Sequence, residues 1–376
     1  MDDFHTTGAV EKRSGDLQGD PARSGSWDSR MIGQENIKER LKSSIINGNV
    51  NHAYIFEGEE GSGKKTLADL FSMTLQCERV LSDSSLPDDP AADHSRRGGG
   101  RTAEPCLCCP SCSKALSRNH PDIIRLTHEK PNSISVNEIR EQVVNDILIK
   151  PYSGRYKIYI IAEAEKMTIQ AQNALLKTLE EPPEYAVIIL LTENAAGLLP
   201  TIISRCAVLR LYPLDDNVIN KYLLETLNVD EYQADIYTAL ARGNIGRAKS
   251  FLGNEAFNTI KDEALRLLKN IQDMGMGRFT DTMKLLGENK AGIDDFFDIL
   301  TLWFRDVLLC KATGSTERLI FKEELASIKN EAGSVSFEGL NKTLKAIDEA
   351  RKRLSANVNY EMTLELLILN IKSSLR

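Results

Sequence analysis

The feature that most constrains the fold is a glycine-rich stretch at residues 58–66, GEEGSGKKT. An apolar run at 53–57 precedes this stretch and predicts a buried strand, and the segment 64–76 predicts a helix. A strand, a glycine-rich loop and a helix in this order are typical of a phosphate-binding loop, because glycines let backbone N–H groups surround phosphate oxygens. The candidate phosphate contacts are Gly58, Gly61, Gly63 and Lys64. The stretch therefore predicts an α/β fold with a nucleotide site.

Two positions that would support Mg²⁺ at such a loop lack the required oxygen atoms. The residue after the loop lysine ordinarily carries a hydroxyl, but here it is Lys65, and Thr66 lies about 100° further round the helix. A second apolar run at 157–161 ends in Ala162, where an acidic ligand is expected. Glu163 keeps the position of a water-polarising glutamate and would be vestigial. We expect a pocket, lined by Lys65 and Thr66 among others, that can bind ATP or ADP and hydrolyses it poorly. The alternative is a plain core strand with a solvated glutamate at its end.

Strands and helices alternate through the first half of the chain. The other predicted strands are 122–127, 157–161, 187–191 and 207–212, and the predicted helices are 34–46, 64–76, 136–148 and 168–180. Ser135 and Glu138 form a capping box before the third helix, and Pro182 ends the fourth. This alternation predicts a parallel sheet flanked by helices, with ligands at the carboxyl ends of the strands.

The rest of the chain differs in character. Residues 1–26 are polar and without periodicity, so we expect a disordered tail, and the similar segment 79–105 is expected to be a disordered surface insertion. No strand pattern follows Pro213. We expect a small helical domain at 213–255 and a larger one at 256–376.

Four cysteines have the spacing of a metal site. Cys106, Cys109 and Cys112 follow one another at three-residue intervals, and Cys77 at the end of a predicted helix is the natural fourth ligand. Four thiolates form a closed tetrahedral site, which predicts structural Zn²⁺. An iron–sulfur cluster is the alternative, although the C-x₃-C-P that usually follows is missing. Cys108 lies off the spacing and would be a spare thiol.

The bulk properties limit the possible partners. The chain of 376 residues has a net charge of −7 and a pI near 5.5, so it is not a polycation that coats nucleic acid. We expect no membrane span, because no apolar run of about 18 residues occurs, and no signal peptide at the N-terminus. Seven cysteines without a secretion signal favour a reduced, cytoplasmic location.

Further segments accompany the loop and the cysteines. They are Ile32-Gly33-Gln34, His52-Ala53-Tyr54, Asn119-His120-Pro121-Asp122, residues 171–183 (AQNALLKTLEEPP) and residues 199–206 (LPTIISRC). Together they resemble the AAA+ clamp-loader subunits of bacterial DNA polymerase III, over about 27–212. The resemblance implies an AAA+ P-loop domain at 27–212, a helical lid at 213–255, and an all-α collar at 256–376 that carries most of the ring contacts.

The resemblance also implies roles for single residues. Each ATP site in the family's pentameric ring is completed by an arginine of the neighbouring subunit, and Arg205 in the Ser-Arg-Cys motif matches it. The alternative is an arginine that pairs with a carboxylate near a helix end. Thr192 and Asn194 match the family's first sensor and Arg247 matches its second sensor, although all three could be relics.

Lys65 and Ala162 place the chain with the hydrolysis-poor, delta-prime branch of the family. That branch implies a subunit of the polymerase holoenzyme without intrinsic catalysis, which assembles with motor subunits and a delta-type subunit. The complex would place the sliding clamp on primed DNA, and Lys177 is a candidate DNA contact. The first alternative is an active, gamma/tau-like ATPase motor of the same complex. The second is a zinc-dependent protein that binds nucleic acid by itself.

Overall fold

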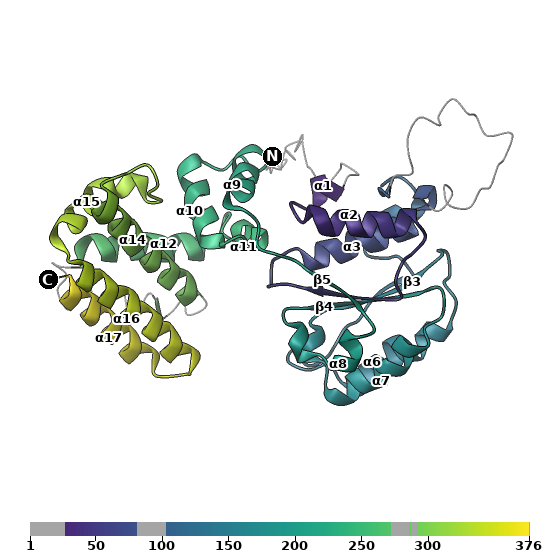
Figure 1. Ribbon diagram of the computed structural model, residues 1–376. Helices are drawn as coiled ribbons and strands as arrows, with labels where there is room; N and C mark the ends of the chain where they lie inside the picture. The colour runs from purple at the N-terminus through teal and green to yellow at the C-terminus, as the bar shows by residue number, and fades with distance from the viewer. Residues whose placement is uncertain (1–26, 81–102, 272–285, 288–291, 376) are drawn as a thin grey trace, which may run out of the picture.

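The computed structural model describes residues 27–80, 103–271, 286–287 and 292–375 (Figure 1). The expected tail and most of the expected insertion lie outside these residues. The predicted insertion, 79–105, is too wide at both ends. Val80 is buried in a helical turn, and Ala103 is also buried. Glu104 accepts a hydrogen bond of 2.9 Å from the backbone N–H of Trp27 and pairs with Lys42, so tertiary contacts hold this polar segment in place.

A parallel sheet forms the centre of the first domain, as predicted. Within the described residues it has the strand order β2-β3-β4-β1-β5. The strands are β1 (Ala53–Glu57), β2 (Ile123–Arg125), β3 (Lys157–Ile161), β4 (Ala186–Thr192) and β5 (Ala207–Arg210). Strand β4 is buried along its whole length because helices cover both faces of the sheet.

The alternation along β1 assigns the two faces. Tyr54 and Phe56 pack into a cluster with α2 (Glu35–Ile46) and α3 (Lys64–Gln76), whereas Ile55 packs into the opposite cluster. The helices on that second face are α6 (Val136–Ile139), α7 (Ile169–Glu180) and α8 (Pro200–Ile203). Figure 1 shows the sheet between these two helical layers. The carboxyl ends of the strands therefore share one edge.

The expected helix at 136–148 is not one continuous α-helix. Its capping box is confirmed, because Ser135 and Glu138 exchange side-chain and backbone hydrogen bonds. After α6 the chain makes a π-helical turn, Arg140–Val144, and then a 3₁₀ turn, Asp146–Leu148. The backbone N–H of Ile149 donates to the carbonyl of Asp146 at 3.0 Å and closes the 3₁₀ turn, and the buried Lys157 ammonium donates to the carbonyls of Asp146 and Ile149.

The remainder of the described chain is helical. The segment expected to form the lid contains α9 (Asp216–Glu225), α10 (Glu231–Ala241) and α11 (Ile245–Ser250). The segment expected to form the collar contains α12 (Glu255–Asn270), α14 (Ile293–Thr313), α15 (Leu325–Ser334), α16 (Phe337–Ser355) and α17 (Tyr360–Ser374), and we use both names for these helices. Lid residues such as Leu240 and collar residues such as Phe296 belong to one apolar cluster. Trp303 and Phe304 are fully buried in this cluster. The lid and the collar thus share a core.

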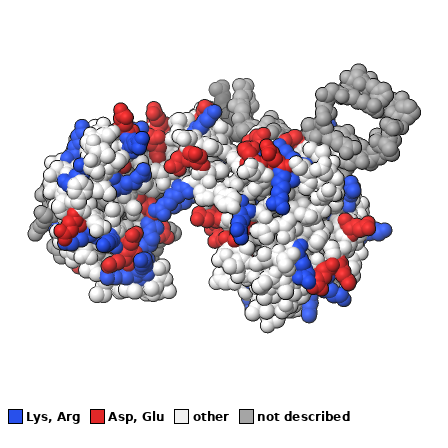
Figure 2. Space-filling model, in the orientation of Figure 1, with Lys and Arg blue, Asp and Glu red and all other residues white. Residues whose placement is uncertain are grey.

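On the face shown in Figure 2, acidic and basic side chains are interspersed, and no large patch of one charge is visible there. None of the described helices has the length and apolar character needed to cross a bilayer.

Candidate functional site

The phosphate-binding loop lies where the sequence predicts it, between the carboxyl end of β1 and the start of α3. Gly61 and Gly63 have φ angles of 82° and 98°. These left-handed conformations are favourable only for glycine, which explains the spacing of the motif. Helix α3 begins at Lys64, so its unpaired N–H groups face the loop and form an anion site in the usual way.

A cavity of about 840 Å³ opens beside the loop. Its volume lies within the range typical of ligand pockets. The predicted residues that line it are Gly61, Gly63, Lys64, Lys65, Thr66, Glu163, Thr192 and Arg247. Gly58 and Asn194 are not among the lining residues. The structure therefore assembles most of the predicted nucleotide site around one space.

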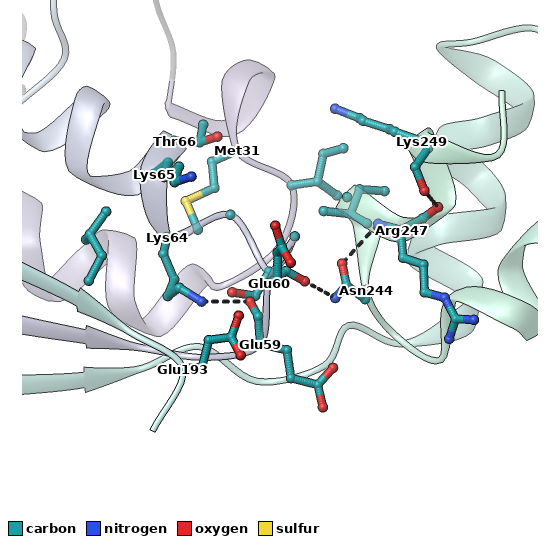
Figure 3. A pocket seen from close by; sticks show the side chains of 18 of the residues that line it. Met31, Glu59, Glu60, Lys64, Lys65, Thr66, Glu193, Asn244, Arg247 and Lys249 are labelled. Atoms are coloured by element: carbon teal, nitrogen blue, oxygen red, sulfur yellow. Dashed lines mark hydrogen bonds between the residues drawn. The ribbon is translucent and has the colours of Figure 1, made fainter. Parts of the chain in front are cut away.

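Lys64 points back into its own loop (Figure 3). Its ammonium donates to the backbone carbonyl of Glu59 at 2.9 Å and to the carbonyl of Gly58. Burial lowers the pKa of the Lys64 ammonium, while the carboxylates of Glu193 and Glu165 act in the opposite direction. These carbonyl contacts hold the lysine in the position from which it could meet a phosphate.

The two positions that would support Mg²⁺ have no suitable side-chain oxygen in the structure either. Lys65 and Thr66 are exposed at the first turn of α3, and Ala162, directly after β3, has no side-chain oxygen. Glu163 pairs with Lys166 at 2.9 Å and with His128 at 3.4 Å. The hydrogen bond from Lys166 lowers the pKa of Glu163. A carboxylate held ionised in this way is a weak base.

Two acidic residues at the cavity were not predicted. Glu165 and Glu193 follow the carboxyl ends of β3 and β4 and line the cavity near Lys64. Oε2 of Glu165 is buried without a hydrogen-bond partner among the described residues. Their place after two parallel strands is the signal that could have identified them, because these strand ends meet at one edge.

The lid rests directly on the phosphate-binding loop. The side-chain amide of Asn244 donates to the carbonyl of Glu60 at 2.6 Å, and the backbone N–H of Gly246 donates to the carbonyl of Gly61 at 3.1 Å. A Cβ atom at position 246 would lie 2.5 Å from that carbonyl oxygen, so glycine is required there. Sequence reasoning missed both lid residues, since their partners lie far away in the chain.

Arg247 lines the cavity, but its guanidinium turns away from Lys64 (Figure 3). It donates to Asp295 at 2.8 Å and to Asp298 at 2.6 Å, both on α14 of the collar. Asp298 is only 2% exposed and also accepts bonds of 2.6 Å from Arg242 and Arg351. The predicted second-sensor residue is therefore part of an ion-pair cluster between lid and collar.

The predicted first-sensor residues are used locally. The side chain of Asn194 accepts the N–H of Ala196 at 2.9 Å and so caps a short 3₁₀ turn, Ala195–Gly197. The hydroxyl of Thr192 donates to the carbonyl of Asn194 at 3.1 Å. Thr192 lines the cavity, but Asn194 does not.

The four predicted cysteines come together. The Sγ atoms of Cys77, Cys106, Cys109 and Cys112 all lie within 4.8 Å of one another, and Cys108 stays outside as an exposed thiol. Zn–S bonds of about 2.3 Å in a tetrahedron place sulfur atoms about 3.8 Å apart, and the Cys106–Cys112 distance is 4.0 Å. The residues present therefore fit Zn²⁺.

The surroundings of the sulfur atoms also suit thiolates. Backbone N–H groups of Cys106, Cys109 and Cys112 each donate to the sulfur of the preceding cysteine in the cluster, at 3.3–3.4 Å. A hydrogen bond from the thiol of Cys112, together with the backbone N–H of Cys106, lowers the pKa of Cys77. Helix α5 (Pro110–Leu116) carries Cys112 and packs its apolar residues into the same cluster as α3.

Arg205 lies on a different part of the domain, just after α8, and does not line the cavity. It pairs with Glu180 at the end of α7, with 2.7 Å between Nη2 and Oε1. It also donates to the carbonyl of Thr201 at 2.9 Å. Within this chain, Arg205 therefore forms the ion pair near a helix end that was the alternative prediction for this residue.

Comparison with known proteins decides the family. A family model described as "DNA polymerase III, delta subunit" matches residues 33–215, and a second, described as "DNA polymerase III, delta subunit, C terminal", matches residues 261–373. DNA polymerase III subunit delta' of Bacillus subtilis (strain 168) is 30% identical over 351 residues, which are 92% of this chain and 98% of that protein. The chain belongs to the DNA polymerase III clamp-loader family.

Other relatives show how far the clamp-loader likeness extends. Subunit tau of the same Bacillus subtilis strain is 28% identical over 313 residues, which are 78% of this chain and 52% of that protein. A crystal structure of a DNA polymerase III gamma subunit-related protein from Thermotoga maritima covers 91% of this chain and 99% of that one, with 20% identity and a TM-score of 0.41. Both the delta' and the tau branches of the clamp-loader family are thus represented among the relatives.

Proposed function

We propose that this chain is a delta-prime type clamp-loader subunit, which acts as a scaffold for motor subunits and hydrolyses ATP poorly itself. One observation carries the proposal. Both metal-supporting positions of its own cavity lack a suitable oxygen, whereas Arg205 lies outside that cavity and can serve another site.

The chemistry at the chain's own loop supports weak hydrolysis. Phosphoryl transfer needs a metal ion on the terminal phosphates and a group that orients water. Lys65 brings a cation where a metal ligand belongs, and Ala162 contributes nothing to the metal. Glu163 is paired with Lys166, which weakens it as a base. Lys64 and the α3 N-terminus still provide contacts for ATP or ADP.

Arg205 would act in trans. A guanidinium that reaches a neighbour's γ-phosphate stabilises the charge that develops in the transition state. Arg205 would contact one neighbouring motor subunit. The ring would consist of this chain, the motor subunits and a delta-type subunit. The ring would place a sliding clamp on primed DNA in the cytoplasm.

The cysteine cluster would hold a structural Zn²⁺. Cys77, Cys106, Cys109 and Cys112 would be its ligands, and four protein ligands leave no position for water. The bound ion would tie α5 to the end of α3 and so support the domain that carries the phosphate-binding loop.

The test is ATP turnover in a reconstituted ring with only one arginine finger. The motor subunits carry alanine in place of their own Ser-Arg-Cys arginines, so Arg205 of this chain is the only finger left. Clamp and primed DNA are present, and this chain alone is the blank. We expect Arg205→Ala to lower turnover by about 10³-fold, the usual worth of such a finger.

Arg210→Ala is the matched control. Arg210 is also a surface arginine that pairs with a glutamate at 2.7 Å, but it lies on β5 and pairs with Glu57. We expect it to leave turnover unchanged. Unchanged turnover with Arg205→Ala would refute the finger role. Turnover by the chain alone would favour the second candidate, an active gamma/tau-like motor. The retained Lys64 and the open cavity support that candidate.

A further inference from the structure

Arg205 lies in a corner between two helices. Glu180 is the last residue of α7, and Arg205 follows α8 by two residues. The guanidinium donates through Nη2 to Glu180 at 2.7 Å, and through Nη1 to the carbonyl of Thr201 at 2.9 Å and the hydroxyl of Ser204 at 3.4 Å. The side chain is thus held by groups from both helices.

The two helices of this corner are fixed to each other by a buried amide. Gln172 on α7 accepts the N–H of Leu199 at 2.8 Å and donates to the carbonyl of Gly197 at 3.4 Å, both just before α8. Leu175 and Ile202 fill the space between the helices and are fully buried. The carboxylate of Glu180 therefore projects from a rigid support.

Glu180 is poorly placed for the helix that carries it. A carboxylate at a helix C-terminus is opposed by the helix dipole, which favours cations there. Pro182 prevents α7 from extending further, so Glu180 stays in the last turn of the helix. Arg205 offsets this unfavourable charge. Removal of Glu180 should therefore not destabilise α7.

The contacts leave Arg205 with donors to spare. A guanidinium has five N–H donors. Three of them serve Glu180, Thr201 and Ser204, so the Nε–H and one Nη2 hydrogen have no partner among the described residues. The arginine can meet an incoming phosphate while Glu180 still holds it.

We propose that Glu180 is a positioning residue for Arg205, which holds the guanidinium ready for the nucleotide of a neighbouring subunit. The inference rests on the proposed function. An exposed ion pair is worth little by itself, so Glu180 does not sequester the arginine. An arginine side chain loses rotamer entropy when it becomes fixed against a phosphate. Because the contact with Glu180 already restricts Arg205, less of this entropy is lost when Arg205 contacts the nucleotide.

The test uses the single-finger ring with Glu180→Ala in this chain. We expect kcat to fall about three- to tenfold, because Glu180 removes only part of the side-chain entropy of arginine, whose full loss corresponds to about 10- to 30-fold. The KM for ATP should stay unchanged, because the finger acts in the transition state. Glu180→Asp keeps the charge and should recover part of the loss. Glu181→Ala removes a neighbouring exposed carboxylate that has no ion pair in the described chain, and should have no effect.

A second comparison separates positioning from a structural role. In a chain that already carries Arg205→Ala, the added Glu180→Ala should change turnover no further. An additional loss there would overturn the inference, and so would unchanged or faster turnover with Glu180→Ala alone. If Arg205→Ala itself has no effect, the proposed function fails and the inference fails with it. A slowed Arg205→Ala ring with a normal Glu180→Ala ring refutes only the inference.

Discussion

The lid–collar junction and the corner between α7 and α8 each hold an arginine for which the sequence predicts a role at a phosphate. Arg247 in the junction lies 2.6 Å from Asp298, and Arg205 in the corner lies 2.7 Å from Glu180. The distances are nearly the same. The carboxylates differ, since Asp298 is 2% exposed and Glu180 is 50% exposed.

This difference in burial decides what each arginine is free to do. A buried carboxylate without a cation is costly, so Asp298 binds its arginines firmly. An exposed pair contributes about 0–1 kcal/mol and can be rearranged at little cost. Arg247 is therefore committed to its own chain, whereas Arg205 is available to a partner. Three predictions test this role of burial and one tests the cavity, in order from the largest expected effect to the smallest.

Asp298→Ala should have the largest effect. It removes three charge-assisted hydrogen bonds to one buried carboxylate, which, allowing for the partial exposure of the arginines, should lower the free energy of unfolding by about 3–5 kcal/mol. Urea unfolding followed by circular dichroism measures the loss. Asp294→Ala is the matched control, because Asp294 is 70% exposed and its contact with Arg351 is longer, at 3.5 Å. Equal losses for both variants would contradict the role given to burial.

Glu331→Gln tests a buried carboxylate that has no cationic partner among the described residues. Burial raises the pKa of Glu331 to about 7 from an ordinary value of 4.5, although Trp303 donates a bond of 2.7 Å to it. Because the folded pKa is the higher one, the protonated form stabilises the fold, and that contribution is lost as the pH rises from about 4.5 through 7. The variant should gain about 3 kcal/mol over the native chain at pH 8 and nothing at pH 4.5.

Unfolding curves at both pH values check this second prediction. Taking the difference between the variant and the native chain cancels the titration of other groups. A difference that does not change with pH would show that Glu331 keeps its ordinary pKa in the fold.

Restoring the missing metal ligands tests the cavity rather than the ion pairs. Lys65→Thr together with Ala162→Asp should tighten ATP binding at least about tenfold, and only when Mg²⁺ is present, because a bound metal supplies several kcal/mol on phosphate oxygens. Isothermal titration with and without EDTA measures the change. The same double variant with Lys64→Ala should lose the gain. A gain that survives EDTA would refute the explanation.

Arg247→Met should have the smallest effect on nucleotide binding. Since the guanidinium faces Asp295 and Asp298, the affinity for ATP should change by less than about twofold. Titration with a fluorescent ATP analogue gives the affinity. A tenfold loss would show that Arg247 leaves its collar partners to contact the nucleotide.

Local sequence patterns were sufficient for much of the fold. The five described strands lie within one or two residues of their predicted positions, and the capping box at Ser135 is confirmed. The four cysteines of the predicted metal site also meet. These features depend on periodicity, glycine conformation and turn chemistry, which act over a few neighbouring residues. The exception is 140–148, whose last turn is contacted by the buried Lys157 ammonium through two backbone carbonyls.

The tertiary structure alone decided which arginine serves which carboxylate. Arg247 and Asp298 are 51 residues apart in the chain, and Asn244 lies 184 residues from its partner Glu60. The sequence shows the charges and the Ser-Arg-Cys motif, but burial sets the strength of an ion pair, and burial exists only once the helices pack. The sequence by itself predicted an α/β domain with a glycine-rich loop that lacks two metal-supporting side chains, because these features depend on local patterns. Only packing showed that Arg247 is bound within the chain and that Glu180 holds Arg205.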